Sequence, residues 1–231
     1  MTPTATSTAV SVTGLTKSYG GRTAVDDLDI ELPSGVVAGF VGPNGAGKTT
    51  TMAMLLGLVR PTAGTGTVLG SSIDEPAAYL PRVGALIESP AFYPALSGAE
   101  NLRVFAIIGG HDTAPIPALL DTVGLGGRGD DRYRSYSLGM KQRLGIAAAL
   151  LGDPDLLILD EPANGLDPQG VREMRSLIGQ VAESGRTVLV SSHDLSELEQ
   201  VCDWLVLIDT GRSLYQGPTS ALLDSVAPGL D

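Results

Sequence analysis

The chain has 231 residues, 26 of them acidic and 15 basic, so its formal net charge is −11. This acidic balance argues against a nucleic-acid partner, because broad nucleic-acid binding requires a basic surface. The single cysteine, Cys202, excludes an intramolecular disulfide framework and a cysteine-rich zinc site, and it suits a reducing cytoplasm. The sequence contains no run of about 18 apolar residues, so we expect any membrane role to depend on a partner.

The N-terminal part of the chain predicts a tail followed by an antiparallel sheet. Residues 1–8 are rich in Thr and Ala and carry no Lys or Arg, which favours a frayed tail over a secretory signal. Residues 9–15 and 23–32 have the alternation that is typical of strands, and residues 16–21 predict the turn between them. Because acids alternate with apolar residues from 23 to 32, we expect a half-solvated antiparallel sheet.

A phosphate-binding loop follows a predicted buried strand at 36–41. Residues 42–49 fit the pattern G-x-x-x-x-G-K-[ST], and residues 49–58 have the apolar spacing of a helix. Glycines let backbone N–H groups curl around an anion, and the helix N-terminus adds partial positive charge. Lys48 brings a full charge to the β- and γ-phosphates, and the Thr49 hydroxyl can ligate Mg²⁺. The residues of this loop that we expect to bind the nucleotide are Gly42, Asn44, Gly45, Ala46, Gly47, Lys48, Thr49 and Thr50.

The character of the chain changes at Glu88. Before it we expect a loop at 60–64, a strand at 66–70, a short helix at 76–82 and a buried strand at 84–87. After it prolines are frequent, and two helical runs stand among loops. The first run opens with a capping box formed by Ser97 and Glu100, and the second covers residues 116–123. We interpret residues 88–134 as an inserted helical subdomain.

The rest of the chain alternates helices and strands. We expect helices that begin at Ser137 and Asp167, a helix at 194–201, and strands at 155–159, 186–191, 204–209 and 213–217. Such alternation predicts a mainly parallel sheet that is covered on both faces. The predicted fold class is α/β: a P-loop NTPase core formed by residues 9–87 and 135–231, with an N-terminal antiparallel β subdomain and the inserted helical subdomain.

A second acidic site follows the predicted strand at 155–159. Four apolar residues precede Asp160, which is the Walker B pattern of a P-loop protein, and the strand places this acid beside the phosphates, where it can hold Mg²⁺. Glu161 comes one residue later and points elsewhere, so we expect it to accept a proton from attacking water. The alternative is a strand that simply ends in two surface acids.

The order of these motifs resembles that of the ATP-binding subunits of ABC transporters over residues 15–217, nearly the whole chain. Tyr19 stands where the family has an aromatic residue that stacks on adenine. Residues 136–140 occupy the position of the signature motif, and residues 163–167 that of the D-loop. His193 follows an apolar strand, as the switch histidine of the family does, which implies contact with the γ-phosphate and a catalytic role.

The resemblance also implies nucleotide contacts outside the P-loop. The serine hydroxyl and glycine backbone of the signature would clasp the γ-phosphate of ATP held by the opposite subunit. Ser137 and Asp167 also suit helix caps, and Tyr19 also suits a turn. The nucleotide-binding residues implied by the resemblance are Tyr19, Val25, Ser137, Gly139, Met140 and Asp167.

The sequence departs from the common family pattern in two places. The signature reads Ser-Leu-Gly-Met instead of Ser-Gly-Gly-Gln, but the retained serine and glycine preserve the expected anion contact. Glu88 stands where most members have a glutamine that contacts Mg²⁺ and the attacking water and senses the membrane partner. Glutamate can still ligate Mg²⁺, but it adds negative charge and cannot donate a hydrogen bond when ionised. Both variants resemble bacterial ATPases of antibiotic- and lantibiotic-resistance exporters.

The resemblance implies an ATPase that uses ATP and Mg²⁺ to power a separate integral membrane subunit, in the export of an antibiotic, a peptide or another toxic compound. Two ABC ATPase subunits would close head to tail around two ATP molecules, and we prefer a homodimer to a heterodimer. The chain would be cytoplasmic and peripheral, on the inner face of the cell membrane. The subdomain at 88–134 would transmit closure to the membrane partner.

Other classes explain the sequence less well. A soluble ABC ATPase of translation or DNA repair typically carries two cassettes, a coiled-coil insertion or cysteine-rich zinc modules, which this sequence lacks. An ABC importer ATPase is a further alternative, although many of these carry a C-terminal regulatory domain. A GTPase would need a guanine-reading Asn/Thr-Lys-x-Asp, which is absent. A kinase would not explain residues 136–140 or His193.

Overall fold

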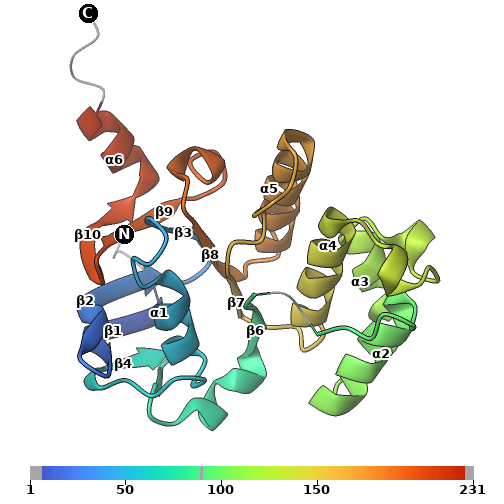
Figure 1. Ribbon diagram of the computed structural model, residues 1–231, viewed down its shortest axis with the longest axis horizontal. Coiled ribbons are helices and arrows are strands. Elements are labelled where there is room, and N and C mark those ends of the chain that lie inside the picture. The colour runs from blue at the N-terminus through green and yellow to red at the C-terminus, as the bar shows by residue number, and fades with distance from the viewer. Residues whose placement is uncertain (1–6, 89–90, 227–231) are drawn as a thin grey trace, which may run out of the picture.

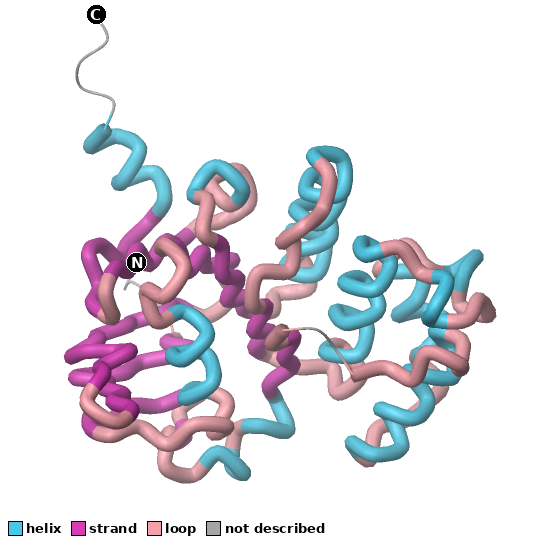
Figure 2. Tube along the Cα trace, viewed as in Figure 1, coloured by secondary structure: helices cyan, strands magenta, loops and turns pink. Residues whose placement is uncertain are grey.

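The computed structural model describes residues 7–88 and 91–226 and has two parts: the strands lie together at one end, and a group of helices lies at the other (Figures 1 and 2). The tail predicted for 1–8 falls mostly on residues 1–6, which lie outside the described residues, as do residues 89–90 of the predicted subdomain. The first strand already begins at Thr8, within the predicted tail. No helix in the described ranges is both long and apolar enough to cross a membrane.

The predicted antiparallel sheet is confirmed, and it has the strand order β2-β1-β4-β5. Its strands are β1 (Thr8–Tyr19), β2 (Arg22–Pro33), β4 (Ala63–Val68) and β5 (Ser71–Ser72). In β2 the apolar side chains are buried, whereas alternate acids face solvent, as the pattern predicts. The turn predicted at 16–21 is too long. Only Gly20 and Gly21, which both have positive φ, make it, and the strand continues to Tyr19.

The second sheet has the order β10-β9-β3-β8-β7-β6, and all its strands are parallel except β10. They are β3 (Val37–Val41), β6 (Val83–Leu86), β7 (Leu156–Leu159), β8 (Thr187–Ser192), β9 (Trp204–Asp209) and β10 (Arg212–Pro218). Every residue of β3, β7 and β8 is buried, as expected for central parallel strands. Backbone hydrogen bonds from Gly42 to Ser192 and from Asp160 to Leu86 hold the carboxyl ends of these strands together.

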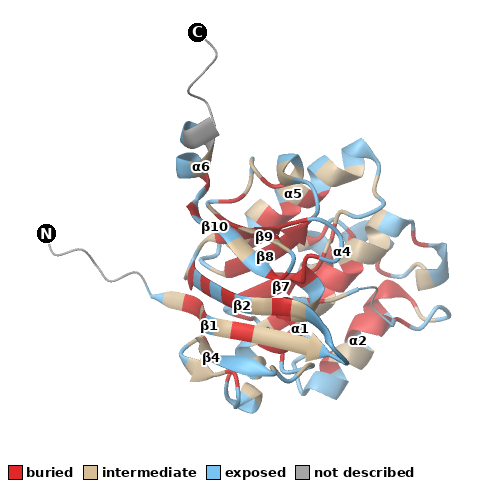
Figure 3. Cartoon of the chain, turned by 60° about the vertical axis from the view of Figure 1, so that its left-hand side comes forward, coloured by how far each residue is buried: buried red, intermediate tan, exposed pale blue. Residues whose placement is uncertain are grey.

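Both faces of the parallel sheet are covered, as predicted. Successive residues of β7 alternate between two apolar cores: Leu156 and Ile158 pack with α1 (Lys48–Leu55) and the antiparallel sheet, whereas Leu157 and Leu159 pack with α5 (Pro168–Ala182) and the helical part. Buried residues therefore run along the sheet and the helix faces that meet it (Figure 3). A last helix, α6 (Thr219–Val226), was not predicted.

The helical part consists of α2 (Gly98–Gly109), α3 (Ile116–Thr122) and α4 (Leu138–Ala149), which pack against one another. The capping box of Ser97 and Glu100 is present at the start of α2. Helix α4 also packs on β6. Helix α4 therefore belongs to the helical part as much as to the core. The boundary that we predicted at residue 134 separates α4 from α2 and α3, on which it packs.

Two predicted helices are wrong. Residues 194–201 form only one 3₁₀ turn, Leu195–Glu197, which the Asp194 side chain caps by accepting from the Ser196 N–H. The Glu197 carboxylate is drawn out of the predicted helix, because it accepts a hydrogen bond from the Ser192 hydroxyl. The segment 76–82 forms two 3₁₀ turns, Pro76–Ala78 and Leu80–Arg82, since its prolines cannot donate helical hydrogen bonds. Two further 3₁₀ turns cover Gly126–Arg128 and Tyr133–Ser135.

Candidate functional site

The loop after β3 forms an anion cradle from backbone N–H groups. Gly47 is the N-cap of α1 with φ of 106°, and the first helical hydrogen bond runs from the Thr51 N–H to its carbonyl, 2.8 Å away. The N–H groups of residues 47–50 have no acceptor within the described part of the chain. A Cβ atom at Gly47 would lie 2.6 Å from the Ala24 carbonyl, so only glycine fits there. These free donors at a helix N-terminus match the predicted phosphate site.

Lys48 points back across the loop and is only 5% exposed. Its Nζ atom donates to the carbonyl oxygens of Gly42, 2.6 Å away, and Pro43, 3.3 Å away. The same ammonium group lies 3.1 Å from Oε1 of Glu161. These contacts compensate for the desolvation of a buried charge. The structure therefore brings together the predicted phosphate-binding lysine and the predicted base.

Thr49 and Asp160, two of the predicted metal ligands, are in direct contact. The Thr49 hydroxyl donates to Oδ2 of Asp160 over 2.6 Å, which joins the start of α1 to the end of β7. A hydroxyl and a carboxylate are hard oxygen donors of the kind Mg²⁺ prefers, and Mg²⁺ typically completes its ligands with water and phosphate. Within the described ranges no group of three or more His, Cys, Asp or Glu residues could hold a metal. The donor set thus fits a metal bound jointly with a phosphate ligand.

Glu161 and His193 form a second contact at this edge of the sheet. Nδ1 of His193 lies 2.8 Å from Oε2 of Glu161. This hydrogen bond, together with the negative charge of Glu161, raises the pKa of His193 above its ordinary value, against the smaller opposing effects of burial and Lys48. Glu161 has φ of 48°, a left-handed conformation that is uncommon for a residue with a side chain.

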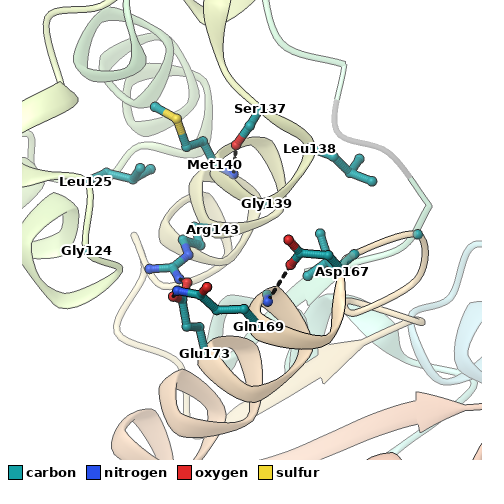
Figure 4. A pocket seen from close by; sticks show the side chains of 13 residues that line it. Gly124, Leu125, Ser137, Leu138, Gly139, Met140, Arg143, Asp167, Gln169 and Glu173 are labelled. Atoms are coloured by element: carbon teal, nitrogen blue, oxygen red, sulfur yellow. Dashed lines mark hydrogen bonds and ion pairs between the residues drawn. The ribbon is translucent and has the colours of Figure 1, made fainter.

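The signature and D-loop residues line one pocket of about 580 Å³ at the start of α4 and α5 (Figure 4). Ser137 accepts a hydrogen bond from the Met140 N–H and caps α4, while Asp167 accepts one from the Gly170 N–H and caps α5. Both caps that the sequence allows are therefore present. Arg143 forms an ion pair with Glu173 across the floor of this pocket and so joins α4 to α5.

Three other predicted residues lie around the site. Tyr19 is 49% exposed at the end of β1, with Lys17 Nζ 4.9 Å from its ring centroid. Val25 is completely buried, so its side chain has no surface for the nucleotide contact that we predicted. Its methyl group instead lies beneath the P-loop, 3.2 Å from the position of a Cβ on Gly47. Glu88 is exposed just beyond β6, with φ of 57°, and has no hydrogen bond or ion pair in the described structure.

Sequence reasoning missed one residue at the centre of the site. Ser191 was placed only as the last residue of a strand, yet its hydroxyl contacts both Asp160 and Glu161. The available signal was weak: two serines, 191 and 192, close an otherwise apolar run before His193. Cys202, by contrast, takes no part in the site, and burial raises the pKa of its thiol to about 12.

Comparisons with known proteins agree with this geometry. The family described as ABC transporter matches residues 25–164. A bacitracin transport ATP-binding protein of Bacillus licheniformis is 48% identical over 215 residues, which cover 92% of this chain and 70% of that protein. A lantibiotic transport ATP-binding protein of Streptococcus pyogenes is 41% identical over 207 residues, 90% of each chain. An ATP-binding cassette of an ABC transporter in its ADP conformation has a similar fold, with a TM-score of 0.87 at 20% identity over 97% of this chain and 96% of that one. The structure of an ATP-binding subunit of an ABC transporter is also similar, with a TM-score of 0.82 at 29% identity over 96% of this chain and 95% of that one.

The contact between His193 and Glu161 predicts a pH-dependent signal. We expect His193 to titrate above its ordinary pKa of 6.5 and Glu161→Gln to lower its pKa, because the mutation removes the charge that stabilises the imidazolium. The pKa of His193 is higher in the folded protein than its ordinary value of 6.5 in an unfolded chain. The contact with Glu161 therefore stabilises the fold fully below pH 6.5, and this contribution is lost as the pH rises through the folded-state pKa of His193. NMR titration of the imidazole signals measures both pKa values.

The chain has two histidines, so the His111→Gln variant assigns the His193 signal. An equal His193 pKa in the parent and Glu161→Gln proteins would contradict the contact.

Proposed function

This chain belongs to the ABC transporter family as an ATP-binding and ATP-hydrolysing subunit, and we propose that the transporter it powers exports an antibiotic, a peptide or a similar toxic compound. The observation that carries the ATPase role is the convergence of the P-loop, Asp160 and Glu161 at one edge of the sheet. The class of cargo rests on relatives that are named for bacitracin and lantibiotic transport. The direction rests on relatives named as Nod factor export ATP-binding proteins, which are 42% identical to this chain.

Each group at this edge has a role that its chemistry supports. The free N–H groups and Lys48 bind the phosphates of ATP, because they supply positive potential at the start of a helix. Thr49 and Asp160 would hold Mg²⁺, which would neutralise charge on the phosphates. Glu161 accepts the proton of the attacking water, and His193, which is held by Glu161, contacts the γ-phosphate. Glu88 is a further oxygen donor near this edge and a candidate third ligand.

The signature residues need a second subunit to reach a phosphate. Helix α1 and the start of α4 lie on opposite sides of the molecule, with the parallel sheet and α5 between them (Figure 1). One chain therefore cannot apply its own signature to the phosphates on its own P-loop. We propose that two copies pair head to tail, so that Ser137, Gly139 and Met140 of one copy complete the site of the other. Asp167, which caps α5, then lies at the interface between the two copies.

This chain has a groove between its two parts that suits docking of the membrane subunit. This groove, of about 490 Å³, is lined by residues of β6, α2 and α4, including Leu86, Phe105 and Ala148. Beside it on α2, Ile107 and Ile108 are more than two-thirds exposed. An apolar helical segment of the membrane subunit fits this chemistry. Docking there would hold the chain at the cytoplasmic face of the cell membrane, with Glu88 at the end of β6 beside the groove.

Two substitutions separate binding from hydrolysis. We expect Lys48→Ala to weaken ATP binding by about 10- to 100-fold, because it removes a charged donor to the phosphates. Glu161→Gln keeps the size of the side chain but not its basicity, so we expect normal binding with hydrolysis slowed by about 10²- to 10⁴-fold. Equilibrium binding of a fluorescent ATP analogue and phosphate release measure the two effects. Glu183→Gln, at the far end of α5, is the matched control.

Normal phosphate release by the Lys48→Ala protein would overturn the P-loop assignment. Normal release by Glu161→Gln would move the role of the base to another residue, with Glu88 tested first.

Glu88 is expected to affect coupling more than affinity. It lies exposed beyond β6, beside the proposed docking groove, and glutamine can still offer an oxygen to Mg²⁺, so we expect Glu88→Gln to change the stimulation of hydrolysis by the membrane subunit while ATP binding stays the same. Reconstituted transporter in liposomes gives the stimulated rate, and the isolated chain gives the basal rate. A large loss of ATP affinity with unchanged stimulation would contradict this role.

Co-purification tests the transporter assignment itself. We would tag the Glu161→Gln chain in its native host, solubilise the membranes with ATP present and identify the proteins recovered. We expect a polytopic membrane protein in near-equal amount, since slow hydrolysis should preserve the ATP-bound assembly. The added change Ile108→Glu should release this protein, because it places a charge in the proposed apolar contact, whereas Leu214→Glu, on exposed β10, should not.

Recovery of a soluble assembly such as ribosomes, with no membrane protein, would overturn the transporter role and leave the ATP site intact.

A further inference from the structure

Ser191 lies between the two acids of the site and uses both hydrogen-bonding capacities of its hydroxyl. Its Oγ atom donates to Oδ1 of Asp160 over 2.5 Å and accepts a hydrogen bond from the Glu161 N–H over 2.8 Å. The side chain is 1% exposed at the carboxyl end of β8, so water does not compete for either bond. One hydroxyl on one strand thus contacts two consecutive residues that follow the neighbouring strand.

The contact with Glu161 supports an unfavourable backbone conformation. Glu161 has φ of 48°, where a Cβ atom crowds the chain, and such a conformation persists only when surrounding contacts hold it. The carboxylate end of this residue is held by Lys48 and His193. The backbone of this residue is held by the Ser191 hydroxyl, which accepts the hydrogen bond from the Glu161 N–H. The direction in which the Glu161 side chain leaves the strand therefore depends on Ser191.

The contact with Asp160 orients a carboxylate. Oδ2 of Asp160 accepts the Thr49 hydroxyl, and Oδ1 accepts the Ser191 hydroxyl. With both oxygens engaged, the plane of the carboxylate is fixed, and Oδ2 is directed toward the residue with which it would share Mg²⁺. Without Ser191, rotation about the last side-chain bond would be restrained on one side only.

We propose that Ser191 is a positioning residue for ATP hydrolysis, whose single hydroxyl sets both the plane of the Asp160 carboxylate and the backbone that carries Glu161. The inference rests on the proposed roles of these two acids. A hydroxyl suits this place because it donates and accepts through one small atom, which an aliphatic side chain cannot do. By coupling the two acids, Ser191 keeps the metal-holding group and the base in a fixed mutual orientation.

A purely structural role would also explain a buried, hydrogen-bonded serine, and Thr187 distinguishes the two cases. Thr187 lies on the same strand, is 2% exposed, and accepts a hydrogen bond from the Gly35 N–H over 2.9 Å. It is four residues from Ser191, about 13 Å along the strand, and lies at the opposite edge of the sheet. Thr187→Val therefore removes a comparable buried hydroxyl without touching either acid.

The test compares Ser191→Ala, Ser191→Thr and Thr187→Val in the purified 231-residue chain. We expect Ser191→Ala to lower kcat by about 10- to 100-fold, as loss of an orienting contact typically does. It should also raise the Mg²⁺ concentration needed for half-maximal rate, whereas binding of a fluorescent ATP analogue without Mg²⁺ stays unchanged. Ser191→Thr retains the hydroxyl and should restore kcat, and Thr187→Val should hydrolyse ATP like the parent protein.

A readout independent of activity comes from His193, whose titration reports the placement of the Glu161 carboxylate. Without nucleotide, we expect the His193 pKa to fall in Ser191→Ala and to stay unchanged in Thr187→Val. If Ser191→Ala does not fold, Ser191→Cys, which has similar size but bonds weakly, takes its place in every measurement.

The inference is overturned if Ser191→Ala and Thr187→Val give the same kcat, Mg²⁺ dependence and His193 pKa. Absence of ATP hydrolysis in the parent protein would instead overturn the proposed function, and the His193 comparison would still decide whether Ser191 places Glu161.

Discussion

A short chain of hydrogen bonds joins the ends of three strands, and the rest of the site depends on it. Thr49, at the start of the helix that follows β3, donates to Asp160 after β7, and Asp160 accepts in turn from Ser191 at the end of β8. Parallel strands bring their carboxyl ends to one edge but do not fix side-chain directions there. These bonds supply that direction, so a general property of the fold becomes a specific arrangement of acids and donors around one loop.

The charges around this chain explain how a strongly acidic protein can hold a polyanion. The net charge of −11 repels ATP at long range, but the cradle presents free N–H groups and the buried Lys48. Because Lys48 is buried, solvent and salt screen its charge less than they screen the charges on the surface. Asp160 and Glu161 lie beside Lys48, so the negative charges of these two acids outnumber the single positive charge of the lysine. The raised pKa of His193 favours its positive form, and a divalent cation held by Thr49 and Asp160 would add further positive charge.

Local signals predicted the parts of the fold and site that depend on neighbouring residues. The P-loop, the capping box before α2 and the cap at Asp167 are determined within a few positions, and all are present. Long-range contacts decide the rest. The helix expected at 194–201 does not form, and its Glu197 side chain instead accepts a hydrogen bond from the Ser192 hydroxyl. The contacts of Ser191 with Asp160 and Glu161 exist only because β7 and β8 are neighbouring strands. Val25 is buried because it belongs to the apolar core between the antiparallel sheet and α1, and it also lies against Gly47 of the P-loop; neither contact can be seen in the sequence of its own strand.

The phosphate cradle and the signature, which form the two halves of the proposed ATP site, differ in burial. This difference suits a dimer that opens and closes around ATP. Lys48 and Asp160 are buried and fixed by several contacts, whereas Ser137, Leu138 and Asp167 are exposed around the pocket at the starts of α4 and α5. A buried half can hold ATP without a partner, while an exposed half is free to engage and release the phosphates of another copy. Arg143 and Glu173 tie the exposed half to the core through α5, whose other end packs beneath the sheet. The signature therefore belongs to the same helix, α4, that packs against α2 beside the proposed membrane contact, whereas the phosphate cradle belongs to the sheet.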